Sequence, residues 1–93
     1  MTTAGQRLEL LKGAVAWRVV GSTAIVLDLR RSEYLEFNQA ACLMMEMIAA
    51  GTSLADIVGE LEQQYDVSAE QAMSDATELI DEMSSRGWLA SAS

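Results

Sequence analysis

The chain has 93 residues, 51% of them apolar, with six basic and fourteen acidic side chains and a formal net charge of −8. This length supports one domain with a single modest core, and no apolar run approaches the length of a bilayer span. The absence of histidine excludes a catalytic triad or dyad with a histidine base. One cysteine excludes an internal disulfide, and the N-terminus shows no secretory signal pattern, so we expect a cytoplasmic protein that does not associate with membranes.

Charge is distributed unevenly along the chain. Residues 1–32 hold five basic and two acidic side chains, a net of +3, whereas residues 33–93 hold twelve acidic side chains and Arg86, a net of −11. An anionic helical part repels phosphate backbones, so we expect no nucleic-acid partner. The acidic surface is interpreted either as a solvated face or as a match for a cationic or amphipathic peptide.

Period-2 alternation in the first third of the chain predicts an antiparallel meander after a loose arm at residues 1–13. The Gly21-Ser22 pair suits a two-residue hairpin turn, because glycine supplies the positive φ that such turns require. In the second strand Ile25, Leu27 and Leu29 share one face. The three predicted strands are Ala14–Val20, Thr23–Leu29 and Glu33–Phe37.

The pattern changes to period 3.6 at Asn38, which is a good N-cap, and predicts helices near 39–50, 54–65 and 69–86. The third helix carries two neighbouring stripes, one with Met73, Ala76, Ile80 and Met83, the other with Ala72, Asp75, Ala76 and Leu79. The predicted fold is therefore α+β and winged helix-turn-helix-like. A three-stranded sheet precedes three helices in a domain spanning 14–90, followed by a C-terminal tail at 91–93.

No residue pattern in the chain indicates catalysis. Cys42 has no histidine partner and an apolar neighbourhood, so a buried structural thiol is favoured over a nucleophile. The carboxylates of the third helix lack the loop and glycine of calcium sites, so a solvated face is favoured for Asp75, Glu78, Asp81 and Glu82. The methionines fit core packing better than an adaptable binding surface. We expect a protein without enzymatic activity, metal or cofactor.

Two other functions have weaker support. Thr52-Ser53-Leu54 is similar to the Asp-Ser-Leu tripeptide of acyl carrier proteins, but Thr52 replaces the aspartate and a strand-rich N-terminus does not suit a carrier. A winged-helix DNA-binding regulator would fit the architecture. Its recognition helix, however, would present mainly carboxylates to the DNA.

From Val26 to Leu89 the chain resembles a PqqD-like domain, the peptide-recognition element of ribosomally made, post-translationally modified peptides. The resemblance covers about residues 14–89 and rests on the order and spacing of short motifs. Many relatives have glycine in the second hairpin turn, where this chain has Arg31-Ser32-Glu33. The matching features are the Val26-Leu27-Asp28 strand, Tyr34 before the helix-opening Asn38, Gly51-Thr52, the break at Tyr65-Asp66-Val67, Asp75, and the end at Arg86-Gly87-Trp88-Leu89.

The resemblance implies a non-catalytic adaptor in bacterial secondary metabolism. A precursor's leader peptide would add as a strand beside Glu33–Phe37, lie against the third helix, and be delivered to a leader peptidase in lasso-peptide biosynthesis. The alternative is a peptide chaperone of pyrroloquinoline quinone synthesis that serves a radical enzyme. The expected peptide-binding residues are Glu33, Tyr34, Leu35, Glu36, Phe37, Ala72, Asp75, Ala76 and Leu79.

The predicted site is physically consistent. An edge strand leaves unpaired N–H and C=O groups that an extended peptide can satisfy. The small Ala72 and Ala76 would leave a trough between strand and helix, with Leu79 as its floor. Glu36 and Asp75 could pair with a basic residue of the peptide or cap its backbone.

Overall fold

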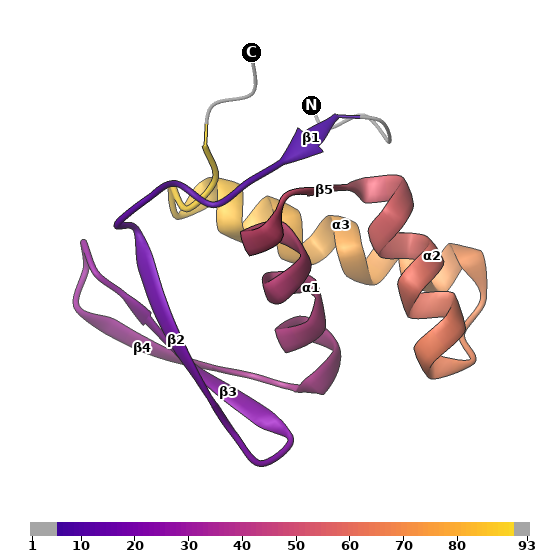
Figure 1. The fold of residues 1–93 in the computed structure, drawn as a ribbon, viewed down its shortest axis with the longest axis horizontal. Coiled ribbons are helices and arrows are strands. Elements are labelled where there is room, and N and C mark those ends of the chain that lie inside the picture. The colour runs from indigo at the N-terminus through magenta and orange to yellow at the C-terminus, as the bar shows by residue number, and fades with distance from the viewer. Residues whose placement is uncertain (1–5, 91–93) are drawn as a thin grey trace.

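A three-stranded antiparallel sheet lies beside a cluster of three helices in the computed structural model, which describes residues 6–90 (Figure 1). The strands are β2 (Val15–Val20), β3 (Thr23–Asp28) and β4 (Glu33–Phe37), in the order β2-β3-β4. This meander, followed by the three helices, confirms the predicted α+β fold. The first strand begins one residue later than predicted, and the second ends one residue earlier.

Two tight turns set the register of the sheet. Val20 pairs with Thr23 across the two-residue loop, in which Gly21 has φ +65°, the conformation for which glycine was expected. The turn between β3 and β4 places Ser32 at φ +55°, a left-handed conformation that L-residues other than glycine adopt at a cost. Asp28 then pairs with Glu33.

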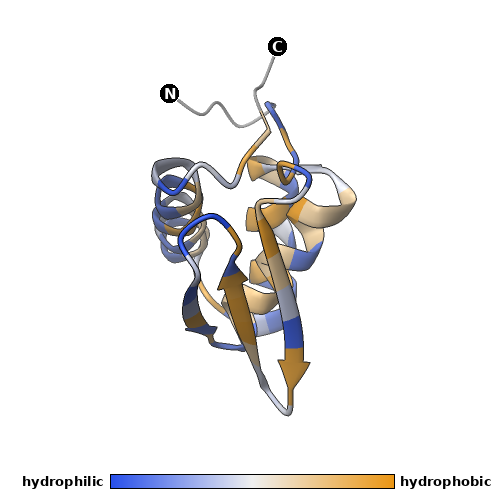
Figure 2. Cartoon of the chain, turned by 90° about the vertical axis from the view of Figure 1, so that its left-hand side faces the viewer, coloured by the Kyte–Doolittle hydropathy of each residue, from blue (hydrophilic) through white to orange (hydrophobic). Residues whose placement is uncertain are grey.

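The more apolar side of β3 faces away from the helices. Ala24, Val26 and Asp28 are buried, while Ile25 and Leu27 are only half-buried and point to the opposite side. Figure 2 looks onto this outer side of the sheet with the helices behind it. The inner side tolerates Asp28 because this carboxylate has partners from the chain's C-terminal end, described below.

Each helix begins at a polar N-cap, and that of the first helix is the predicted Asn38. The helices are α1 (Gln39–Ala50), α2 (Leu54–Tyr65) and α3 (Ala69–Ser85). The side-chain oxygens of their N-caps accept backbone N–H groups: Asn38 from Ala41, Ser53 from Asp56 and Ser68 from Gln71. The first helix ends where Gly51 takes φ +89°.

The core lies between the inner face of the sheet and the helices. Trp88, just after α3, is fully buried and its ring centroid lies 6.2 Å from that of Phe37. On α3 the buried stripe consists of Ala72, Ala76, Ile80 and Met83, whereas Met73 is 40% exposed. The prediction that Met73 lies on the buried stripe is therefore wrong. The buried stripe contains Ala72 instead of Met73.

The N-terminal arm is ordered where the structure describes it, contrary to the loose arm expected for residues 1–13. The short strand β1 (Arg7–Leu8) pairs with β5 (Thr52–Ser53), and Leu8 is buried. Two backbone hydrogen bonds then join the arm to the C-terminal segment, from Leu11 N–H to Trp88 O and from Ala90 N–H to Glu9 O. Residues 1–5 and the predicted tail at 91–93 lie outside the described part of the chain.

No helix within residues 6–90 is long and apolar enough to cross a membrane.

Candidate functional site

Strand β4 forms one edge of the sheet, as predicted, and some of its backbone groups have no partner among residues 6–90. The N–H of Leu29 donates to the carbonyl of Ala14 at 3.0 Å, which fixes the alternation of hydrogen-bonded pairs along β3. The odd-numbered residues of β3 therefore bond to β2 and the even-numbered ones to β4. Consequently Glu33, Leu35 and Phe37 bond to β3, and the N–H and C=O groups of Tyr34 and Glu36 point to the free edge.

The free edge of β4 lies on the same side of the molecule as α3. In Figure 2, β4 is the left-hand strand and α3 the helix at the left. At the Phe37 end of β4, a cavity of about 280 Å³ opens between the first turns of α1 and the middle of α3. It is lined by Asn38, Ala40, Ala41, Met44, Asp75, Glu78 and Leu79.

Most of the predicted site residues lie around this edge and cavity. Tyr34 is 74% exposed and Glu33 and Glu36 are also exposed, whereas Leu35 is half-buried and Phe37 buried. On α3, Asp75 is exposed and Leu79 half-buried, and both line the cavity. The structure thus brings the edge strand and these two helix residues to one side of the molecule.

Ala72 and Ala76 do not line an open trough. Both side chains are 0% exposed and belong to the hydrophobic core. Their small size allows the close packing of α3 on the rest of the core. The cavity residues that were not among the predicted peptide-binding residues are Asn38, Ala40, Ala41, Met44 and Glu78.

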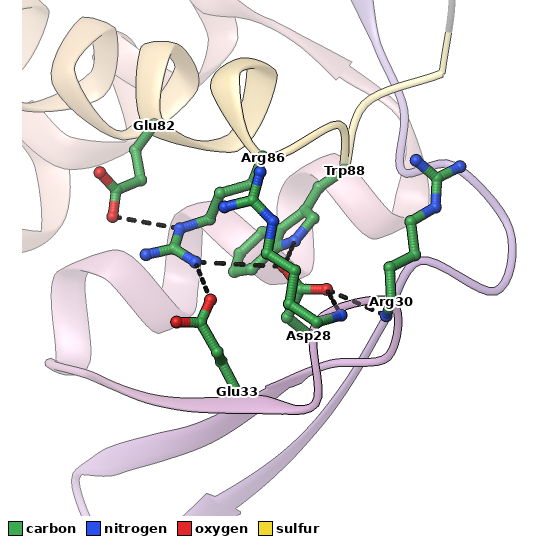
Figure 3. A network of polar contacts seen from close by, with 7 residues as sticks. Asp28, Arg30, Glu33, Glu82, Arg86 and Trp88 are labelled. Carbon is green, nitrogen blue, oxygen red and sulfur yellow. Dashed lines mark hydrogen bonds and ion pairs between the residues drawn. The ribbon is translucent and has the colours of Figure 1, made fainter.

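At the other end of β4 a guanidinium group joins the strand to α3 (Figure 3). Arg86 is only 21% exposed; its Nη1 lies 3.2 Å from Glu33 Oε1 and its Nε 3.5 Å from Glu82 Oε1. The guanidinium also lies 5.7 Å from the ring centroid of Trp88, within cation–π range. Arg86 was noted in the sequence as the only cation of residues 33–93, but its partners could not be identified.

Asp28 anchors the same network from the inner face of the sheet. Its Oδ2 accepts the indole N–H of Trp88 at 2.9 Å, and its Oδ1 accepts the backbone N–H groups of Arg30 and Arg31. Mainly through the Trp88 hydrogen bond, the pKa of Asp28 is lowered below 3.8, although burial opposes this shift. The ionised carboxylate therefore holds the turn before β4 in place.

The remaining candidate groups are Cys42 and the carboxylates considered for a metal site. Cys42 is buried, as expected, and burial together with the neighbouring Glu46 carboxylate raises the pKa of its thiol, which disfavours the nucleophilic thiolate. Within residues 6–90 no group of three or more histidine, cysteine, aspartate or glutamate side chains could hold a metal ion.

Comparison with known structures supports this fold. One match is entitled "TbiB1 in Complex with the TbiA(beta) Leader Peptide", with a TM-score of 0.79 and 14% identity over 91% of this chain and 98% of that one. Another is entitled "Lasso peptide synthetase B1 complexed with the leader peptide", with a TM-score of 0.76 and 24% identity over 90% of this chain and 98% of that one. At these identities the matches establish a shared fold. No curated protein sequence matches the chain.

The sequence itself matches a protein family over more than half of its length. The family, described as "Coenzyme PQQ synthesis protein D (PqqD)", aligns with residues 23–89, which extend from the start of β3 to just beyond Trp88. This span includes the free edge of β4, the cavity beside α1 and the whole Asp28–Arg86–Trp88 network. The chain belongs to the PqqD family.

Proposed function

We propose that this protein is a non-catalytic adaptor that binds the leader segment of a ribosomally synthesised precursor peptide. The observation that carries the proposal is the unpaired edge of β4 beside α3. Tyr34 and Glu36 together offer two N–H and two C=O groups, which an extended peptide can satisfy by becoming a fourth strand. Hydrogen bonds of this kind accept many sequences, so selectivity has to come from side-chain pockets.

The cavity at the Phe37 end of β4 can supply that selectivity. Leu79, Met44 and the alanines of α1 give it an apolar lining, while Asp75 and Glu78 lie in its wall. Glu78 has no ion pair or hydrogen-bond partner among the described residues, and Asp75 accepts a hydrogen bond from Gln71 at 2.8 Å. An apolar anchor of the leader with a basic residue next to it would suit this cavity.

We further propose that the protein delivers the leader to the leader peptidase of a lasso-type pathway. Support comes from the two structural matches, of which one is a lasso peptide synthetase B1 with its leader peptide and the other is TbiB1 with the TbiA(beta) leader peptide. A second candidate is presentation of a precursor to the radical enzyme of pyrroloquinoline quinone synthesis, which the description of the matched family favours. Binding assays with a leader peptide from each type of pathway distinguish the two.

Amide hydrogen exchange tests the binding edge directly. In the free protein we expect rapid exchange at Tyr34 and Glu36 and slow exchange at Leu35, because only the Leu35 N–H bonds to β3. Adding the leader should slow exchange at Tyr34 and Glu36. The opposite sheet edge offers a matched control, since the N–H groups of Trp17 and Val19 also point away from β3 and should remain unaffected. Protection of Trp17 and Val19 instead would place the peptide on β2 and refute the proposal.

A further inference from the structure

Opposite charges lie at the two ends of the free edge of β4. At the Phe37 end, Asp75 and Glu78 lie in the wall of the cavity between α1 and α3. At the other end, the turn before β4 carries Arg30 and Arg31, both of them exposed. The five residues of the strand separate the two ends by about 17 Å. This separation exceeds the Debye length of about 8 Å at physiological salt, so each end acts on its own part of a peptide strand beside β4.

The two arginines of the turn are held in place by their backbone and not by their side chains. Their backbone N–H groups donate to Asp28 Oδ1, at 3.0 Å from Arg30 and 3.1 Å from Arg31. The Arg30 side chain points away from Asp28 (Figure 3), and its Nη1 lies 3.2 Å from the position that a Cβ of Gly87 would occupy. Arg30 therefore lies against the end of α3, on the path by which a peptide between β4 and α3 leaves the edge.

The carboxylates nearest to this turn already have partners. Asp28 is buried and accepts hydrogen bonds on both oxygens, while Glu33 and Glu82 both form ion pairs with Arg86. Within residues 6–90 the guanidinium group of Arg30 has no ion pair. In a chain with a net charge of −8, this exposed cation can accept a carboxylate from a bound peptide.

We propose that the bound leader carries opposite charges on the two sides of its strand, with acidic residues over the turn at Arg30 and Arg31 and basic residues at Asp75 and Glu78. This inference rests on the proposed function and adds the charge pattern of the peptide to it. Backbone hydrogen bonds to β4 alone accept a strand in several registers, whereas two separated charges favour one register and one direction. A peptide with the same charge on both sides is repelled at one end, which gives selectivity.

The test uses the purified chain and whichever leader peptide binds it in the assays with the two types of pathway. This leader is also prepared with each acidic residue outside its bound strand replaced by lysine. Arg30→Glu reverses a cation that has no ion pair to lose, and Arg31→Gln removes its neighbour. Arg18→Glu is the matched control, because Arg18 is an exposed arginine on β2, the strand farthest from the free edge. Thermal unfolding first shows that each variant is folded.

We expect Arg30→Glu to raise the Kd of the leader about threefold to tenfold and Arg31→Gln about twofold to fivefold, as for exposed charge pairs. Arg18→Glu should change the Kd by less than about twofold, and all differences should shrink as the salt concentration rises. A leader with lysine in place of the acidic residue at the turn should bind the Arg30→Glu variant more tightly than it binds wild type. This exchange of preference is the signature of a direct charge pair.

Unchanged affinity of both turn variants would overturn the inference, and so would a bound leader without an acidic residue beside its strand. Normal leader binding with impaired processing would assign the arginines to the processing enzyme and overturn it as well. A wild-type chain that binds neither type of leader would instead remove the proposed function. Leader binding that protects Tyr34 and Glu36 but ignores the turn variants would refute this inference alone.

Discussion

A proline at Glu36 is the sharpest mutational test of the proposed binding edge. The N–H of Glu36 points away from β3, so Glu36→Pro removes no hydrogen bond from the domain itself. A leader strand can form four backbone hydrogen bonds with Tyr34 and Glu36, and the variant loses one of them. The proline ring also intrudes into the space between strands, which lie only about 4.8 Å apart.

The expected loss of affinity follows from these contacts. A hydrogen bond contributes about 0.5–1.5 kcal/mol net, and the ring should disturb a second one, so the binding free energy should fall by about 1–3 kcal/mol. This range corresponds to an increase of the Kd by about 5- to 150-fold. Isothermal titration calorimetry with the leader peptide measures the change, after circular dichroism has shown that the variant keeps its sheet and helices.

The opposite edge of the sheet supplies the control. Val19→Pro likewise removes an N–H that points away from β3, but from β2. It should cost the domain about as much stability as Glu36→Pro and leave the Kd for the leader unchanged. Equal affinity of the Glu36→Pro variant and wild type would show that β4 does not receive the peptide as a strand, and the reasoning from the free edge would be refuted.

Four further outcomes follow from the structure and its charges. Ala72→Trp should destabilise the domain by about 1–3 kcal/mol or more in urea unfolding, because Ala72 is fully buried; a fully stable variant would show that this position is open. Ser32→Gly should raise the unfolding free energy by about 0.5–1 kcal/mol, because glycine adopts the positive φ at this turn without strain; a loss of stability would contradict this. The folded-state pKa of Asp28 is lowered, so its stabilisation should be complete above the ordinary pKa of 3.8 and be lost as the pH falls through the lowered value. Acid titration of the unfolding free energy should show this loss in wild type but not in Asp28→Asn. Duplex DNA should not bind at physiological salt, and a sequence-specific gel shift that survives added salt would favour the winged-helix regulator instead.

The strands and helices could be predicted because their signals are local. Alternation marked β2, β3 and β4, and Asn38, Ser53 and Ser68 occupy the N-cap positions that their side chains favour. The short strand β1 carried no such signal, since two residues show no periodicity. Its position depends on β5, more than forty residues further along the chain.

The binding site could be predicted only in part, because it depends on tertiary packing. The edge position of β4 followed from the strand order, and Asp75 and Leu79 do line the cavity. The sequence could not distinguish small residues that leave a trough from small residues that permit close packing, so Ala72 and Ala76 were misplaced. The α1 wall of the cavity was missed because its residues meet α3 only in the folded chain.

The inward orientation of Asp28 on β3 also could not be predicted from the sequence. Its contacts help to hold the binding site in shape. By their apolar character, Ile25 and Leu27 would be the better core residues of β3. Asp28 nevertheless faces inward, because Trp88 and Arg86, about sixty residues further along the chain, contact its carboxylate. Arg86 then binds Glu33 at the start of β4. A few contacts therefore fix the first residue of the edge strand against the end of α3 before any ligand arrives. Pre-organisation of this kind reduces the ordering cost of binding, so the network should contribute to peptide affinity without itself lying on the free edge.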